Sequence, residues 1–347
     1  MQLDFSKLKD SGALEGEGAV QAALRAAQEV IDRQRTDSYA RDAVKFLCQM
    51  TADPETARAG VAALFPALIE RLNDSFDPRA CDLYNRVMAQ VIEFYRRLPE
   101  GENLDAGLRS FGLMSEAALL DRKAKLRRRT SPPADLGGVR RAVLLSRVTI
   151  GADVAVTSVI VARLREALPR AEFLLFGSPK LGGLYGGDSR LRIRALDYDR
   201  SGGVLSRLNS WLDIVRAIAE ENDDLNPEEF IVIDPDSRLT QLGLLPVLRD
   251  ERNYFFFESR SYRRPGADRL GTLASRWAGE LLGGTMDFFP YVALPDEHRA
   301  FGRAIAEKMR RAGSQLAAVS LGVGGNQNKR LSDSFEEALI QSLLEGS

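Results

Sequence analysis

The stretch that decides the fold runs from Arg140 to Lys180 and reads RRAVLLSRVTIGADVAVTSVIVARLREALPRAEFLLFGSPK. It begins with a short apolar run of buried-strand length and continues through a turn that carries Gly151. Apolar residues then recur at helical spacing from Val154 to Leu168, and Pro169 ends that helix before a second apolar run. This strand–helix–strand unit predicts a parallel sheet with helices on its faces.

The turn from Arg147 to Asp153 is the first candidate functional element. In parallel sheets of this kind, ligands bind outside the carboxyl ends of the strands, where this turn falls. A carboxylate at Asp153 is suited to act as a general base aimed into that crevice. It is equally suited to cap the helix that starts at Val154, and the residues alone leave both interpretations open.

The pattern of alternating strands and helices continues to the C-terminus. Further strands are predicted at Leu191–Leu196, Phe230–Ile233, Tyr254–Phe257 and Leu316–Leu321. Helices are predicted at Leu205–Glu220, Leu270–Leu282, Pro295–Ala312 and Ser332–Leu344. The segment Leu242–Leu248 is helical or irregular.

The first 130 residues read as helical throughout. Apolar residues at helical spacing predict helices at Gly18–Arg33, Ser38–Met50, Thr51–Leu72, Asp77–Leu98 and Ser115–Arg129. Asp77-Pro78 is a plausible cap and first turn. We therefore predict a helical domain over 1–130 and a linker over 131–139, where Ser131-Pro132-Pro133 stands.

The last predicted helix of this domain ends in six cations, Arg122, Lys123, Lys125, Arg127, Arg128 and Arg129. One interpretation is a solvated helix end, where positive charge suits the helix dipole. The other is a site for an anionic lipid or acceptor, and thus peripheral contact of residues 122–129 with the inner membrane.

Composition sets limits on the function. The 347 residues have a net charge of −1, so no bulk field favours nucleic acid. The sequence contains no apolar run of about 20 residues and no apolar signal core at the N-terminus. Two cysteines, Cys48 and Cys81, fit a reducing cytoplasm. With His298 as the one histidine, triads and metal sites built on several histidines are discounted.

Three stretches resemble the glycosyltransferase family 9, which includes the heptosyltransferases of lipopolysaccharide assembly. They are the turn Arg147–Asp153 with its following helix and strand, the apolar strand Phe230–Ser237 that closes on an aspartate, and the glycine loop with its basic residues, Gly322–Phe335. The resemblance covers Arg140 to the C-terminus, and residues 1 to 130 have no counterpart in it.

The resemblance implies a GT-B fold, in which one Rossmann-like domain binds the acceptor and a second binds the nucleotide-sugar. It implies an acceptor domain over 140–312 and the start of a donor domain over 313–347. The implied reaction is inverting transfer of a sugar to a hydroxyl of a glycan or glycolipid acceptor, with no metal and no cofactor besides the nucleotide-sugar. Asp153 maps to the family's general base, although Ala152 separates it from Gly151 where the family has glycine.

The resemblance also implies a donor-phosphate site in the last predicted strand and loop. Small residues let backbone amides approach a diphosphate, and nearby cations neutralise the leaving nucleotide. The expected residues are Gly322, Gly324, Gly325, Asn326, Lys329 and Arg330. Arg147, Arg238, Arg260, Arg263 and Arg264 lie just past strand ends and are suited to receive an anionic acceptor, with Arg263 and Arg264 equally suited to surface solvation. Gly151 and Asp234 are also expected to bind the substrate.

Two alternatives stay open. Asp234 and Asp236 resemble the metal-binding Asp-x-Asp motif of GT-A glycosyltransferases, although turn chemistry explains them as well. The C-terminal segment supplies only one strand–helix unit of a donor domain, whereas a complete nucleotide-binding half needs several. A longer chain is one explanation, and a non-catalytic binding or scaffold protein on a degenerate transferase domain is the other. The sequence does not indicate the sugar, the nucleotide or the oligomeric state.

Overall fold

The computed structural model describes residues 16–33, 38–129, 136–196, 202–264, 266, 269–284, 286–310, 316–321 and 330–345. The chain divides into two compact units, Met1–Ala293 and Leu294–Ser347. Residues 294–312 belong to the second unit, whereas the sequence interpretation grouped them with the acceptor domain.

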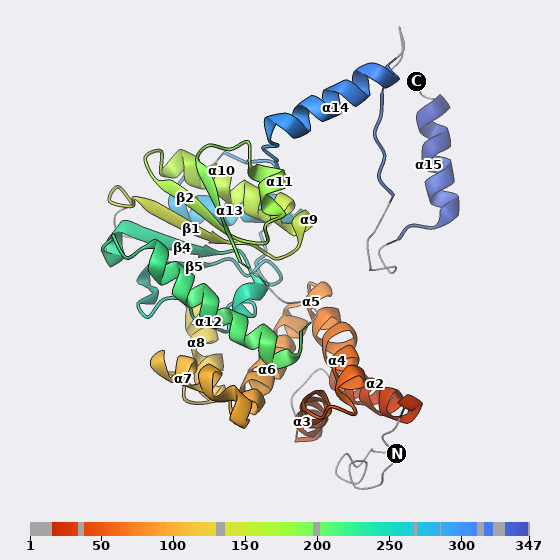
Figure 1. Cartoon of the computed structure of the whole chain (residues 1–347), viewed down its shortest axis with the longest axis vertical. Coiled ribbons are helices and arrows are strands. Elements are labelled where there is room, and N and C mark those ends of the chain that lie inside the picture. The colour runs from red at the N-terminus through yellow and green to blue at the C-terminus, as the bar shows by residue number, and fades with distance from the viewer. Residues whose placement is uncertain are drawn as a thin grey trace. The chain divides into compact units, whose positions relative to one another are not determined.

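A five-stranded, all-parallel sheet forms the centre of the first unit (Figure 1). The strands are β1 Arg141–Leu145, β2 Glu172–Gly177, β3 Leu191–Ala195, β4 Phe230–Asp234 and β5 Tyr254–Phe256. They lie in the order β3-β2-β1-β4-β5, so β1 and β4 are neighbours in the middle and β5 is an edge strand. The predicted α/β class and parallel sheet are confirmed.

Helices cover both faces of the sheet (Figure 1). Ala142 and Leu144 of β1 pack with residues of α10 (Ser158–Ala167) and α13 (Leu270–Leu282). The alternate residues of β1 face the opposite side, where α12 (Val204–Glu221) lies. Because successive side chains of a strand point to opposite faces, both faces of this sheet are buried.

The N-terminal region is mostly helical, as predicted. Its helices are α2 Gly16–Arg33, α3 Ser38–Ala52, α4 Ala57–Ala62, η1 Ala63–Glu70, α5 Arg71–Asp74, α6 Pro78–Tyr95, η2 Pro99–Gly101, α7 Glu102–Ser110 and α8 Glu116–Arg128. Asp77 caps α6 by accepting from the Arg79 amide, and Ser115 caps α8 by accepting from the Ala118 amide.

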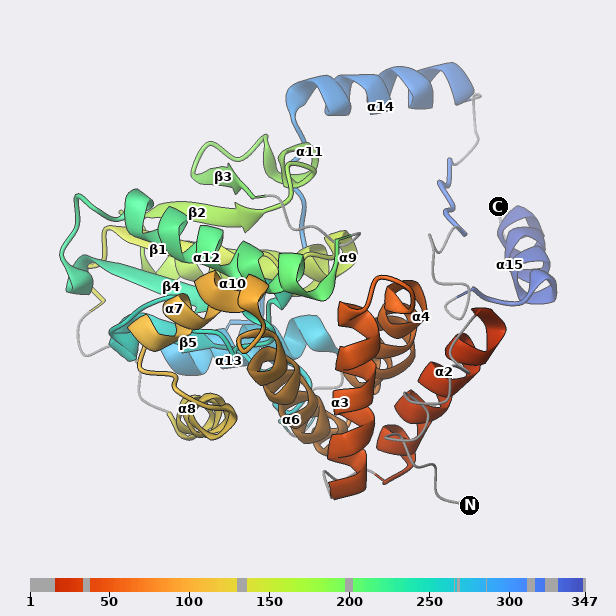
Figure 2. The same ribbon diagram turned by 60° about the horizontal axis from the view of Figure 1, so that its bottom comes forward.

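This helical region shares one hydrophobic core with the sheet. The core runs from Ala19 in α2 to Tyr254 in β5 and includes Trp211 of α12. Figure 2 shows α7 beside α12, where Gly107 lies so close to Leu212 that an added Cβ would approach it to 2.4 Å. The α12 face of the sheet is therefore covered partly by helices that precede the sheet in the chain.

Several local predictions need correction. Leu316–Leu321 forms no strand; residues 316–320 are exposed, and no described strand pairs with the segment. The helix after β1 begins at Ile150, with α9 (Ile150–Ala152) and a π-helical turn η3 (Asp153–Thr157) preceding α10. Thr51–Leu72 is not one helix, because α3 ends at Ala52 and residues 53–56 form a turn before α4 begins at Ala57. The π-helical η1 that follows contains Pro66, which lacks an amide hydrogen.

Three short 3₁₀ turns, η4 Pro227–Glu229, η5 Arg238–Thr240 and η6 Glu251–Asn253, flank β4 and β5, and the helix α11 Leu181–Tyr185 follows β2. The second unit contains α14 (Asp296–Met309) and α15 (Asp333–Glu345), and none of its described residues is buried. Among the helices described, none has the length and apolarity that crossing a membrane requires.

Candidate functional site

The order of the strands reverses between β1 and β4. We call the carboxyl ends of these two strands, with the turns that follow them, the switch point, and this is where α/β sheets bind ligands. The turns that follow these two strands meet at this point. Arg147 donates from Nη1 to the Pro235 carbonyl at 3.0 Å, and Ser237 donates from Oγ to the Ser146 carbonyl. The structure thus brings together Arg147, Asp153, Asp234 and Asp236, which belong to segments more than 80 residues apart.

Asp153 fastens the turn after β1. Its Oδ2 accepts from Ser146 Oγ at 2.7 Å, and its Oδ1 accepts from the Arg147 amide at 2.7 Å and from Thr157 Oγ1 at 2.9 Å. The side chain is buried, with the residue 1% exposed. Burial raises the pKa of the Asp153 carboxyl, and the three hydrogen bonds oppose that shift. Both oxygens are therefore engaged within the protein.

Asp234 has the same character at the end of β4. It is 0% exposed and accepts from the Ser237 amide at 2.6 Å, from Thr240 Oγ1 at 2.5 Å and from the Tyr254 hydroxyl at 2.6 Å. Burial raises the pKa of its carboxyl as well. This carboxylate holds the turn after β4 against the neighbouring strand β5.

Asp236 connects that turn to the loop after β5. Its Oδ2 accepts from Ser259 Oγ at 2.8 Å and forms an ion pair with Arg260, which also donates to the Asn73 carbonyl of α5 at 2.9 Å. The backbone at Asp236 is left-handed, with φ 67°, and Val148 across the switch point has the same φ. A left-handed conformation is unfavourable for a β-branched residue, and such strain concentrates at functional sites.

Arg147 and its neighbours on the turn differ in accessibility. Arg147 is buried, and this desolvation lowers the pKa of its guanidinium despite the nearby Asp236. Thr149, Ile150 and Gly151 are exposed above it. Arg238 lies farther out and faces Glu70 of the helical region at 3.6 Å. The accessible part of the switch point is therefore the backbone of the turn rather than its charged groups.

The expected donor-phosphate residues lie mostly outside the described part of the chain, namely Gly322, Gly324, Gly325, Asn326 and Lys329. Arg330 is described, and it pairs with Asp333 at 2.5 Å. The position of the loop relative to the switch point therefore has no structural description.

The metal-binding alternative finds no support in the geometry. Both oxygens of Asp234 are engaged, and Oδ2 of Asp236 is held by Ser259 and Arg260. No group of three or more His, Cys, Asp or Glu side chains with metal-binding geometry occurs among the described residues. A divalent cation would have to compete with the internal hydrogen bonds on both oxygens of Asp234.

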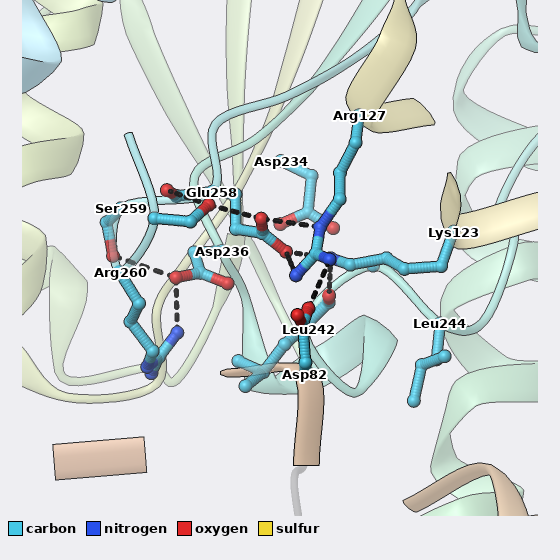
Figure 3. Close-up of polar contacts among 12 residues, drawn as sticks. Asp82, Lys123, Arg127, Asp234, Asp236, Leu242, Leu244, Glu258, Ser259 and Arg260 are labelled. Carbon is cyan, nitrogen blue, oxygen red and sulfur yellow. Dashed lines mark hydrogen bonds and ion pairs between the residues drawn. The ribbon is translucent and has the colours of Figure 1, made fainter. Parts of the chain in front are cut away.

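A buried ionic network that sequence reasoning missed joins the helical region to the loops after β4 and β5 (Figure 3). Lys123 of α8 is 2% exposed, donates to the Leu242 carbonyl at 2.6 Å and pairs with Glu258 at 2.9 Å. Arg127 pairs with Glu258 at 2.7 Å and with Asp82 of α6 at 2.5 Å. These two cations lower the pKa of Glu258 to about 2 against the effect of burial.

The basic run of α8 is thus largely an internal contact. Arg122 also enters this contact, since it donates to the Gly243 carbonyl at 2.7 Å and pairs with Glu251. Arg129 donates to the carbonyls of Glu251 and Arg252. Lys125 and Arg128 are exposed and fit the expectation of a solvated helix end, whereas Arg127 and Arg129 are exposed as well but make the contacts described above. Contact of this run with a membrane stays a prediction, and most of its cations already have partners within the chain.

A groove of about 460 Å³ lies along the open edge of β5. It is bounded by α6 and α8 on one side and by α13 and the loop after β5 on the other. No sequence motif marks this groove, because its walls come from four separated segments. Comparison with known proteins gives no match, since no protein-family model, curated protein or solved structure resembles this chain significantly.

Proposed function

We propose that this chain carries the acceptor-binding half of a GT-B-type glycosyltransferase. The reaction is inverting, metal-independent transfer of a sugar from a nucleotide-sugar to an acceptor hydroxyl. The observation that carries the proposal is the meeting of the turns after β1 and β4 at the switch point of an all-parallel sheet. Because one fold can host many functions, the proposal has to be tested on the chemistry of these turns.

In this proposal Asp153 is the general base. Its raised pKa favours proton uptake, but its oxygens accept from Ser146, Arg147 and Thr157 in the structure. The turn must therefore release the carboxylate when the acceptor binds. Lys329 and Arg330 are proposed to stabilise the departing diphosphate.

The first test measures whether a donor site exists. The chain is incubated with a panel of nucleoside diphosphates and nucleotide-sugars, and its melting temperature is followed with magnesium and with a chelator. Stabilisation by one nucleotide in the chelator supports the proposal. Stabilisation that requires magnesium overturns the metal-independent mechanism.

The second test distinguishes between Asp153 as a general base and Asp153 as a residue that only holds the turn after β1 in place. Asp153→Asn should lower nucleoside diphosphate release by about 10²-fold or more, the usual contribution of a general base. Thr157→Val is the matched control, because it removes one donor to the same carboxylate and leaves the carboxylate in place. It should lose stability and retain turnover. Retained turnover in Asp153→Asn rules out the base assignment.

A non-catalytic binding protein is the second candidate. The observation in its favour is that Asp153, Asp234 and Asp236 are all buried and all accept internal hydrogen bonds. This candidate predicts no thermal shift with any nucleotide and no nucleoside diphosphate release, in the wild type and variants alike.

A further inference from the structure

The groove along β5 combines aromatic walls with a polar rim. Its volume of about 460 Å³ lies within the range of small-molecule pockets, roughly 300–1,000 Å³. Phe255 and Phe256 contribute to it from the strand, Tyr262 from the following loop and Trp277 from α13. It is distinct from the switch point, because none of the switch-point carboxylates lines it.

The buried side chain of Phe257 supports the aromatic wall of the groove from the protein interior. Phe257 is fully buried and packs against Trp277 with ring centroids 5.2 Å apart and against Tyr262 at 5.6 Å. Trp277 and Tyr262 are themselves partly exposed and line the groove. The Arg264 guanidinium covers the Tyr262 ring, with its Cζ 4.4 Å from the ring centroid. Trp277 therefore supplies the apolar surface of this wall, and a ring held in place costs little conformational entropy when a ligand covers it.

The rim is rich in charged groups that neutralise one another. Arg264 makes a bidentate pair with Glu280 at 2.6 and 2.7 Å. Arg127 pairs with both Glu258 and Asp82. The rim therefore offers many N–H donors and carboxylate acceptors side by side without an excess of either charge.

The strand edge adds backbone groups to the groove. The Phe257 amide donates to the Asp234 carbonyl of β4, so the alternation of a parallel ladder directs the N–H and C=O of Phe256 away from β4. Toward the start of the strand, Arg129 donates to the carbonyls of Glu251, Arg252 and Tyr254 and thereby covers the edge. This cover blocks pairing with an added strand and leaves one donor–acceptor pair facing the groove.

We propose that the β5 groove binds a neutral saccharide. A hydroxyl group both donates and accepts hydrogen bonds, which matches a rim of paired arginines and carboxylates together with one backbone N–H and C=O. The C–H face of a sugar ring is apolar and fits the partly exposed ring of Trp277. A nucleotide or a phosphorylated sugar fits less well, since the positive and negative charges of the rim balance and its carboxylates repel an anion.

The identification of this saccharide as part of the acceptor glycan rests on the proposed transferase function, whereas the binding itself does not. The groove lies beside the loop after β5, whose Arg260 holds Asp236 at the switch point. A glycan anchored in the groove would thus contact the same loop that fixes the turn after β4.

Intrinsic fluorescence provides a direct assay, because the chain has two tryptophans in different environments. Trp211 is fully buried and donates from its indole nitrogen to the Pro246 carbonyl at 2.6 Å, whereas Trp277 lines the groove. The full-length chain is titrated with neutral oligosaccharides such as maltose, cellobiose and lactose, and with glucose 6-phosphate and UDP as anionic comparators. We expect a saturable change in emission with at least one neutral sugar and weaker or no change with the anions.

Tryptophan variants show which of the two side chains produces the fluorescence change. Trp277→Phe should abolish the fluorescence change, while Trp211→Phe should retain it. Trp277→Ala should weaken binding measured by calorimetry by about tenfold or more, and Glu280→Gln by a smaller factor, since it unpairs Arg264 at the rim. Circular dichroism checks that each variant is folded.

The outcomes separate this proposal from the transferase. Absence of any response to neutral sugars, or a response to UDP alone, overturns the groove assignment. Saccharide binding that depends on Trp277 without nucleoside diphosphate release supports the groove and counts against the transferase. Turnover that is unchanged in Trp277→Ala, with sugar binding unchanged as well, overturns the groove and leaves the transferase standing.

Discussion

The switch point and the β5 groove use charged residues in opposite ways. At the switch point Asp153, Asp234 and Asp236 are buried and each accepts hydrogen bonds from within the chain. Along the groove, Arg264 and Glu280 are nearly half exposed. Motifs at the ends of strands thus point to the place that is most rigid, whereas the accessible polar surface lies at an edge that no motif marks.

The largest effect on stability is expected at the buried carboxylates of the switch point. Asp234→Ala leaves the Ser237 amide and the hydroxyls of Thr240 and Tyr254 without their common acceptor, and should lower the free energy of unfolding by about 3–5 kcal/mol. Urea denaturation measures the loss. The exposed Asp213→Ala is the control and should change stability by less than about 0.5 kcal/mol. Similar losses in both variants would remove the distinction between the two regions.

The next effect concerns the network that joins the helical region to the sheet. Lys123→Met removes a buried cation from Glu258 and a donor from the Leu242 carbonyl, and should cost about 2–4 kcal/mol. Lys125→Met, two residues along the same helix and exposed, is the matched control with an expected effect near zero. A double-mutant cycle with Glu258→Gln should give a coupling of about 1 kcal/mol or more, and a coupling of zero would contradict direct pairing.

The pH dependence of stability should have opposite signs for Glu258 in the network with Lys123 and for Asp153 at the switch point. The pKa of Glu258 is lowered to about 2, so its stabilisation is present above its unfolded pKa of about 4.3 and disappears as the pH falls toward 2. The stability difference between wild type and Glu258→Gln, about 2–3 kcal/mol at pH 6, should therefore shrink at pH 3.

The raised pKa of Asp153 has the opposite consequence. Its unfolded carboxyl ionises first as the pH rises through about 3.9, which favours the unfolded state. The stability of Asp153→Asn relative to wild type should therefore increase as the pH rises from 3 through the unfolded pKa, whereas that of Glu258→Gln should decrease. Equal trends for Glu258→Gln and Asp153→Asn in urea titrations would contradict the assignment of opposite shifts.

The smallest effect is expected at the open rim. Arg264→Gln breaks a bidentate pair whose partners are 42% and 48% exposed, and should cost no more than about 0.5–1 kcal/mol. Thermal denaturation at low and high salt measures it, since an exposed pair is screened. A loss comparable to that of Lys123→Met would show that the rim is structural.

The strands were the most predictable part of the fold. Short apolar runs located the inner strands β2, β1 and β4 to within one residue at either end, because a strand buried on both faces reads as an uninterrupted apolar stretch. The edge strand β3 is only partly buried and alternates apolar residues with arginines. The same signal failed at Leu316–Leu321, where no described strand supplies a partner for its backbone. A composition suited to a strand does not by itself provide the pairing.

The location of the candidate site was predictable from the sequence, but the burial and internal hydrogen bonding of its carboxylates were not. Carboxyl ends of adjacent parallel strands meet, so the proximity of Asp153 and Asp234 followed from the strand–helix pattern. Their burial depends on Thr157, Thr240 and Tyr254, whose hydroxyls carry no local signal. The contact of Lys123 with Leu242 joins positions 119 residues apart, which no local periodicity encodes.

The shared core of the helical region and the sheet has a consequence for biosynthesis. The apolar faces of α6 and α7 leave the ribosome well before Tyr254, which closes the same core. Tyr254 follows the last residue of α7, Ser110, by 144 residues. At roughly 5–20 residues per second, translation of this interval takes on the order of ten seconds. During that interval β1, β2 and β4 emerge in turn and add their residues to the same core, so the helical region is expected to complete its folding only as the sheet is made.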